Sequence, residues 1–147
     1  RVGFEPACSV GVLTEMLAER CEELHAVDVV HTAAEQARRR VESAGLDHVH
    51  VRTADAREPW PRASCDLLVL SEFLYYTPAD GLDALIGALL ELAEPGATVA
   101  ACHWLGHSAD HACHGEDVHA ALGRRSELTR IVHHREEGFL LEVFVRG

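Results

Sequence analysis

Hydrophobic residues along this chain alternate between compact runs and a spacing of three to four residues. Compact runs of strand length, bounded by turn residues, predict five β-strands: residues 2–5, 23–29, 48–55, 65–72 and 97–104. Segments with helical spacing lie between them: residues 11–20, 32–45 and 78–96. In the first of these helices the apolar stripe comprises Val12, Leu13, Met16 and Leu17. Gly45 and the pair Pro95-Gly96 predict where the second and third helices end.

The last third of the chain continues this alternation and then changes it. Residues 115–125 predict a fourth helix, and strands at 128–135 and 139–145 follow, joined by a short glycine-containing turn. Strands that alternate with helices form a mainly parallel sheet with helices on both faces, whereas a hairpin adds antiparallel strands. We therefore predict one α/β domain over residues 1–147, with a doubly wound, seven-stranded, mainly parallel sheet and an antiparallel C-terminal hairpin.

Composition narrows the function classes. The 147 residues carry a formal net charge of −11, which argues against a nucleic-acid substrate because phosphate binding requires a basic face. No apolar run is long enough to span a bilayer and no signal peptide is visible, so we expect no membrane association. The five cysteines are scattered without a CxxC pair, which favours a reduced, cytoplasmic protein. All 13 basic residues are arginine, which excludes a lysine Schiff base and a P-loop lysine.

The turn after the first strand, residues 5–11 (EPACSVG), is a candidate ligand site, because doubly wound sheets bind ligands at the carboxyl ends of their strands. It has one glycine where nucleotide-binding turns usually have two or three. Ala7 is small enough for a ligand to approach the backbone, but it does not adopt positive φ cheaply. Gly11 opens the following helix, where free backbone amides favour negative charge. The turn therefore predicts a nucleotide site of unusual composition.

Two acidic residues end later strands. Asp28 lies at the end of the second strand, where a carboxylate can take both hydroxyls of a ribose. Asp55 ends the third strand and is placed to reach an exocyclic amine such as that of adenine. Either residue alone fits a helix cap or a solvated turn equally well. Together with Glu5, in order and at successive strand ends, they indicate a nucleoside-binding edge.

Four segments resemble a known family: EPACSVGVLTEMLAERC, AVDV, DLLVLSEFLYYT and VAACHW. They look like the class I S-adenosylmethionine-dependent methyltransferases, which have a Rossmann-like fold. The resemblance is closest to the NodS-like branch, named for the nodulation N-methyltransferase that acts on amino sugars. Members often have EPGCSVG in the first turn, so Ala7 is the single departure there. The resemblance implies S-adenosyl-L-methionine as cofactor, with these contacts: Glu5, Ala7, Cys8, Ser9, Gly11, Asp28, Val29, Asp55, Ala56 and Ser71.

Family members carry helices before the first strand that fold over the cofactor and substrate. In this chain Arg1 already stands at the start of that strand, so the N-terminal lid helices of the family are absent from residues 1–147. We expect an upstream segment, an upstream domain or a partner chain to supply the lid.

Methyl transfer is an in-line displacement that requires an aligned acceptor and the removal of a proton. Glu72, after the buried fourth strand, and His103, at the end of the fifth, are candidate catalytic bases, with Glu72 preferred. A histidine is expected to titrate near neutrality. Tyr75, Tyr76 and Trp104 are candidate substrate contacts, because aromatic rings attract cations and stack on sugars. The two tyrosines fit equally well as packing residues at the start of a helix.

A histidine-rich segment follows the fifth strand. Residues 102–119 hold five histidines and two cysteines, a set that can bind zinc. The segment lacks a second ordered pair of ligands, and the family does not use a metal, so we expect solvated loop histidines and no metal site. Residues 132–137 (VHHREE) are likewise expected to face solvent.

The sequence thus predicts S-adenosylmethionine-dependent methyl transfer to a small molecule, with N-methylation of an amino sugar or related glycoside preferred. The preference for nitrogen rests on the family resemblance. Alternatives that stay open are an O-methyltransferase with the same cofactor and a non-catalytic Rossmann-like domain that binds a partner. A nicotinamide oxidoreductase is disfavoured because the motif GxGxxG is absent.

Overall fold

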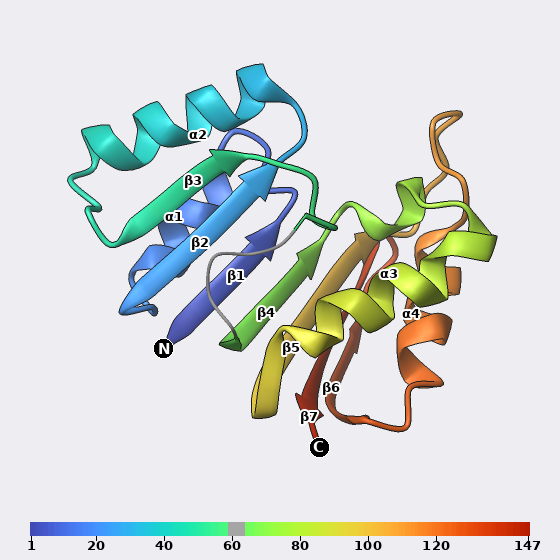
Figure 1. Ribbon diagram of the computed structural model, residues 1–147. Coiled ribbons are helices and arrows are strands. Elements are labelled where there is room, and N and C mark those ends of the chain that lie inside the picture. Colours follow the sequence, from blue (N-terminus) through green and yellow to red (C-terminus); the bar gives the residue numbers. More distant parts are fainter. Residues whose placement is uncertain (59–63) are drawn as a thin grey trace.

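The computed structural model of the protein describes residues 1–58 and 64–147 (Figure 1). A seven-stranded sheet has the order β3-β2-β1-β4-β5-β7-β6. Strands β1 to β5 pair in parallel, whereas β7 runs antiparallel to both β5 and β6. The strands are β1 (Val2–Pro6), β2 (Glu23–Asp28), β3 (Val49–Thr53), β4 (Cys65–Ser71), β5 (Ala93–Trp104), β6 (Leu128–Arg135) and β7 (Phe139–Arg146). The predicted doubly wound sheet with a closing antiparallel hairpin is confirmed.

Helices cover both faces of the sheet. They are α1 (Val12–Ala18), α2 (His31–Ser43), α3 (Ala79–Glu91) and α4 (Gly115–Gly123), with a short 3₁₀ turn η1 (Leu74–Tyr76). One apolar core joins α1 and α2 to the sheet: Ala18, Leu24, Ala26, Ala34, Ala37, Val41, Val49, Val51, Leu67 and Val69. A larger core joins α3 and α4 to the opposite face, and includes Phe4, Val27, Leu68, Leu70, Leu82, Ile86, Leu89, Val99, Val118, Leu122 and Phe144. No helix in the described part of the chain is long and apolar enough to cross a bilayer.

Helix α1 turns only part of its predicted apolar stripe inward. Leu13 and Leu17 pack against the core, but the buried residues are Thr14 and Ala18, whereas Val12 and Met16 are 48% and 58% exposed. The Thr14 hydroxyl donates a 2.6 Å hydrogen bond to the carboxylate of Glu5 inside the protein. A satisfied polar pair therefore takes the inward position that the apolar pattern assigned to Val12 and Met16.

Strand β5 begins earlier than predicted. The pair Pro95-Gly96 was predicted to separate helix α3 from a strand starting at residue 97, but the strand already starts at Ala93. Its register against β4 shifts, because Cys65 faces Ala93 and Leu67 faces Thr98. The extra residues lie at this irregularity, where Gly96 takes a φ of 85° and a proline without an N–H breaks no regular ladder bond.

Candidate functional site

The order of the strands reverses between β1 and β4, so the crevice outside their carboxyl ends is where a ligand of such a sheet binds. Strained backbone conformations are concentrated at the carboxyl ends of β1 and β4. Three non-glycine residues of the described chain have positive φ: Ala7 at 61°, Ser9 at 50° and Glu72 at 57°. Two of them lie in the turn after β1 and one directly follows β4. Conformations of this kind cost on the order of 1–3 kcal/mol each and concentrate at ligand sites.

Glu5 ends β1 as a buried acid. It is 2% exposed, and its carboxylate accepts the hydrogen bond from Thr14. Burial disfavours the charged form and raises the pKa of Glu5 to about 7, although the Thr14 hydrogen bond acts in the opposite direction. The carboxyl group is thus poised to change its charge when a cation arrives nearby.

The turn after Glu5 is held by backbone hydrogen bonds and a close helix contact. The N–H of Cys8 donates to Val27 at 2.9 Å, and the N–H of Gly11 donates to Cys8 at 3.0 Å. A Cβ on Gly11 would stand 2.8 Å from the Cβ of Ala37, so this glycine lets α1 pack on α2. Burial raises the pKa of Cys8 to about 12, and the thiol therefore stays protonated.

Asp28 connects the first turn to the end of β2. One carboxylate oxygen accepts the N–H of Ser9 and the other accepts the N–H of Val30, each at 2.8 Å. The neighbouring Val29 is 70% exposed, which leaves an apolar side chain at the edge of the sheet. Asp28 therefore fixes the strained turn in place, and its carboxylate lies beside an uncovered apolar surface.

Asp55 forms an ion pair that was not predicted from the sequence. Both of its oxygens bind the guanidinium of Arg57, at 2.9 and 2.5 Å, and one also accepts the backbone N–H of Arg57. These hydrogen bonds lower the pKa of Asp55 to about 2. The following residue, Ala56, is half-buried against the core. The carboxylate of Asp55 is therefore part of an ion pair rather than a lone acceptor.

Glu72 stands at the end of β4 as an exposed carboxylate with a fixed neighbour. The hydroxyl of Tyr75 donates to Glu72 at 2.5 Å, and the N–H of Glu72 donates to Cys102 on β5 at 2.9 Å. Burial, followed by the hydrogen bond to Glu72, raises the pKa of Tyr75, so the phenol remains a donor. Ser71, half-buried, pairs with Cys102 at the same strand ends.

An aromatic cluster adjoins Glu72. Tyr75 is buried, as its packing interpretation predicts, whereas Tyr76 and Trp104 are exposed. The ring of His111 stacks on Tyr75 with centroids 4.0 Å apart and meets Tyr76 edge-on at 5.1 Å. Trp104 lies edge-on to His111 at 5.8 Å. His111 was not among the predicted site residues, because nothing in its local sequence distinguishes it from the other loop histidines.

His103 lies in the interior, which overturns two expectations. It is fully buried, and burial lowers its pKa to about 3, so it does not titrate near neutrality. Its Nδ1 lies 3.2 Å from Nε2 of His119, whose Nδ1 donates to the buried carboxylate of Glu142 at 2.8 Å. His133, from the segment predicted to face solvent, donates to the same carboxylate at 2.7 Å. The expectation of solvated histidines is therefore wrong for His103 and His119.

A cavity of about 460 Å³ lies beside the aromatic cluster, between α3, α4 and the histidine-rich segment. Its polar lining mixes both signs of charge: Asp83, His107, His111, His114, Asp117 and Arg124.

The predicted site residues separate into two neighbouring groups. The turn after β1 and Asp28 form one group, and Glu72 with the aromatic residues forms the other.

Comparison with known proteins identifies the family of this chain. The family described as "Methyltransferase domain" matches residues 4–96, which is more than half of the chain. The chain belongs to the methyltransferase domain family. The matched region contains the turn after β1, Asp28, Asp55 and Glu72, so the strained edge of the sheet lies within the part of the chain that matches this family.

The relatives also support the NodS-like branch. Nodulation protein S of Rhizobium tropici is 32% identical over 94 residues, which cover 63% of this chain and 39% of that protein. Nodulation protein S of Bradyrhizobium diazoefficiens is 38% identical over 73 residues, 50% of this chain and 34% of that protein. The aligned part of the chain therefore spans between a third and two fifths of these curated relatives. The predicted resemblance to class I, NodS-like methyltransferases is confirmed.

Solved structures agree on the fold. A candidate methyltransferase from Pseudomonas syringae has a TM-score of 0.83 at 35% identity, covering 99% of this chain and 87% of that one. The N-methyltransferase NodS from Bradyrhizobium japonicum, solved with S-adenosyl-L-homocysteine, has a TM-score of 0.83 at 24% identity, covering 99% and 77%. At that identity the second likeness shows a common fold alone.

Proposed function

We propose that this chain transfers a methyl group from S-adenosyl-L-methionine to the amine of a small molecule, an amino sugar or related glycoside. The observation that best supports the proposal is the position of Glu72. This residue is an exposed carboxylate on a strained backbone, at the point where strand order reverses, and a buried tyrosine fixes one of its oxygens. Because the chain belongs to a methyltransferase domain family, we assign this carboxylate to the methyl acceptor.

The residues at this edge suit the cofactor. S-adenosyl-L-methionine, when bound, supplies a methyl group activated by a positively charged sulfur. Asp28 has oxygens for the ribose hydroxyls, and the exposed Val29 offers an apolar surface for the adenine ring. Glu5 stands at the methionine end, where its carboxyl group ionises readily in response to an ammonium. The left-handed backbone at Ala7 and Ser9 shapes the turn around these groups.

Glu72 and Tyr75 have different proposed roles: Glu72 binds the acceptor, and Tyr75 holds Glu72 in position. An amine arrives protonated at neutral pH, and it must lose a proton before its lone pair attacks a methyl group. Tyr75 occupies one oxygen of Glu72 with a hydrogen bond, which leaves the other oxygen to orient the ammonium and accept its proton. A carboxylate suits this task for an amine better than for a neutral hydroxyl, because it also attracts the positive charge.

Tyr76 and Trp104 form the proposed walls of the acceptor site. Both rings are exposed, and both lie next to His111 in the cluster beside Glu72. Exposed aromatic faces stack on sugar rings and attract cationic groups. His103 is the less suitable base, because its imidazole is buried and bonded toward His119 rather than toward the edge.

We also propose that a lid covers this edge, from a segment outside residues 1–147 or from a partner chain, and that the protein works in the cytoplasm. The exposed Val12 and Met16 on α1 support a covering segment. The five cysteines are all free thiols, in keeping with a reducing compartment.

A methyl-transfer assay tests the proposal. Purified protein is incubated with labelled S-adenosyl-L-methionine and three acceptors: an amino sugar, its N-acetylated form and the sugar with a hydroxyl in place of the amine. We expect transfer to the free amine alone. Transfer to the N-acetylated form and the hydroxyl sugar as well as to the amine would support the O-methyltransferase. Calorimetric binding of S-adenosyl-L-homocysteine without transfer to any acceptor would instead support a non-catalytic binding domain.

A further inference from the structure

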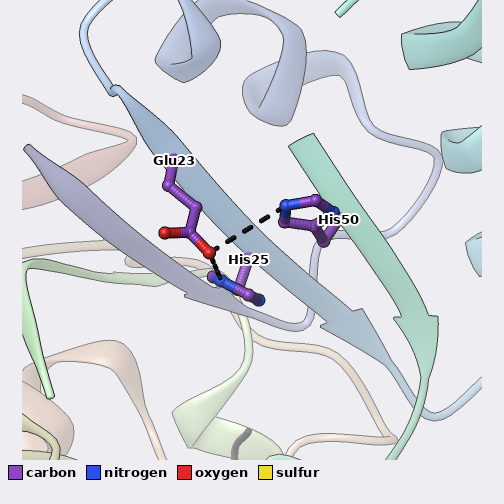
Figure 2. Close-up of side chains that lie close together, drawn as sticks. All are labelled: Glu23, His25 and His50. Atoms are coloured by element: carbon purple, nitrogen blue, oxygen red, sulfur yellow. Dashed lines mark hydrogen bonds and ion pairs between the residues drawn. The ribbon is translucent and has the colours of Figure 1, made fainter. Parts of the chain in front are cut away.

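Three potential metal ligands from β2 and β3 lie close together on the sheet (Figure 2). Glu23, His25 and His50 each offer one ligand atom, and these three atoms all lie within 4.8 Å of one another. Within residues 1–58 and 64–147, this is the single group of three His, Cys, Asp or Glu side chains that meets this condition. We propose that Glu23, His25 and His50 form a binding site for a divalent transition metal of the zinc type.

The strand register brings the three side chains together. Successive residues of a strand point to opposite faces, and Leu24, Ala26 and Val49 belong to the core under α1 and α2. Glu23, His25 and His50 therefore point to the other face. His25 is the register partner of His50 across β2 and β3, and their ring centroids lie 5.0 Å apart. In Figure 1, α3 and α4 lie over the half of this face formed by β4, β5 and β7, away from β2 and β3.

The distances suit a tetrahedral ion. Zinc binds imidazole nitrogen and carboxylate oxygen at roughly 2.0–2.2 Å, so two ligand atoms of a tetrahedral site lie about 3.3 Å apart. Oε1 of Glu23 lies 2.8 Å from Nε2 of His25 and 4.0 Å from Nε2 of His50. These two separations bracket the required value. A small rotation of His50, whose side chain is 49% exposed, brings its nitrogen to the distance that an ion needs.

Burial distinguishes this cluster from a chance group of surface side chains. His25 is 8% exposed and is held on β2 between neighbouring strands, so one ligand is fixed in advance. The half-exposed His50 leaves a path for the ion and room for a water as the fourth ligand. Two imidazoles and one carboxylate suit zinc, cobalt and nickel, whereas magnesium prefers an all-oxygen shell.

Such an ion would act on the fold and not on methyl transfer. Glu23 and His25 lie in the amino-terminal half of β2, whereas the proposed cofactor contact Asp28 ends that strand. An ion shared by β2 and β3 joins the edge strand to its neighbour. Because it binds the folded chain alone, it stabilises that chain by mass action. The site is thus independent of the proposed function, and either can fail without the other.

The test begins with metal-free protein, prepared with a chelator, and zinc titrated in competition with a chromophoric chelator. We expect one high-affinity zinc per chain. His50→Gln and Glu23→Gln should each weaken zinc binding by on the order of 100-fold, because loss of a direct ligand costs at least as much as loss of its supporting partners. Cobalt should give a tetrahedral visible spectrum that both variants lose, and magnesium should not compete.

Two matched variants make the result specific. His134→Gln removes another strand histidine that pairs with a glutamate, Glu136, outside the cluster, and should leave zinc affinity unchanged. A His107→Gln/His114→Gln double variant removes two neighbouring histidines of the histidine-rich segment and should also leave it unchanged. Unfolding of the metal-free variants by urea shows whether each chain is folded before titration.

The thermal midpoint supplies a second readout. Zinc should raise it in the wild-type chain and in both control variants, but not in His50→Gln. Equal zinc affinity in the wild-type chain, His50→Gln and Glu23→Gln overturns the proposal. So does a loss of zinc binding that follows the His107/His114 double variant instead, which would place the ion in the histidine-rich segment.

Discussion

Replacing Glu5 by glutamine should remove a pH dependence of stability that the buried carboxyl group creates. Glu5 lies at the end of β1, almost inaccessible to solvent, with the Thr14 hydroxyl as its hydrogen-bond partner. Burial raises its pKa from 4.5 to about 7. Glutamine keeps the shape of the side chain and its hydrogen-bonding capacity, but it carries no charge at any pH.

The magnitude follows from the shift of the pKa. A difference of about 2.5 pKa units at 1.36 kcal/mol per unit is about 3 kcal/mol. Between the unfolded value of 4.5 and the folded value of about 7, the folded chain holds more protons than the unfolded chain. The free energy of unfolding therefore falls as pH rises through this window, and the whole loss is present above it. We expect Glu5→Gln to match the wild-type chain at about pH 4, below the unfolded pKa, and to exceed its stability by up to about 3 kcal/mol at about pH 8.

Urea unfolding at a series of pH values, without cofactor, measures this difference directly. Glu19→Gln is the matched control, because Glu19 is an exposed acid at the end of α1 and its replacement should leave the pH dependence intact. A difference in unfolding free energy between Glu5→Gln and the wild-type chain that stays constant from about pH 5 to about pH 8 would refute the reasoning. It would mean that Glu5 does not change its proton occupancy on folding.

Three further predictions concern the proposed site. Asp28→Ala should weaken S-adenosyl-L-homocysteine binding by roughly 1.5–3 kcal/mol, the scale of hydrogen bonds to a charged group, and unchanged calorimetric affinity in a folded variant would remove Asp28 from the site. Ala7→Gly should stabilise the chain by about 1 kcal/mol in urea unfolding, because glycine relieves the positive φ of 61°, and should leave cofactor affinity intact; a sharp drop in affinity would make Ala7 a direct contact. Glu72→Gln should lower kcat by roughly 10²-fold with little change in cofactor affinity, whereas His103→Ala should cost less, as single-turnover assays would show. Wild-type transfer by Glu72→Gln together with an inactive His103→Ala would reverse the two roles.

The alternation of strands and helices was predictable because each element has its own local pattern. The run Cys65–Ser71 reads as a strand buried on both faces whatever surrounds it, and a glycine after Ser43 ends α2 by local geometry. Acids at the ends of successive parallel strands share one edge, so the general location of the site also follows from the sequence. The family resemblance rested on the same local segments, and the comparisons confirm it.

Distant pairings were decided by the tertiary structure. Spacing alone placed Val12 and Met16 inward, but Thr14, hydrogen-bonded to the buried Glu5, and Ala18 are the residues of α1 that are buried. The start of β5 depends on its pairing with β4 across an irregularity, which no property of Pro95-Gly96 itself reveals. Both cases require the neighbouring element to be in place before the local pattern can be interpreted.

The charge and proton state of the polar residues likewise followed from packing. In sequence, His103, His119 and Glu142 are three unrelated polar residues, yet the fold buries them in one hydrogen-bonded chain. His25 and His50 meet because the parallel pairing of β2 with β3 places them in register. Local pattern specifies which elements form, because it acts over a few residues. Burial and hydrogen-bond pairing depend on which elements meet, and these properties set the pKa values and the relative positions of the polar side chains in this protein.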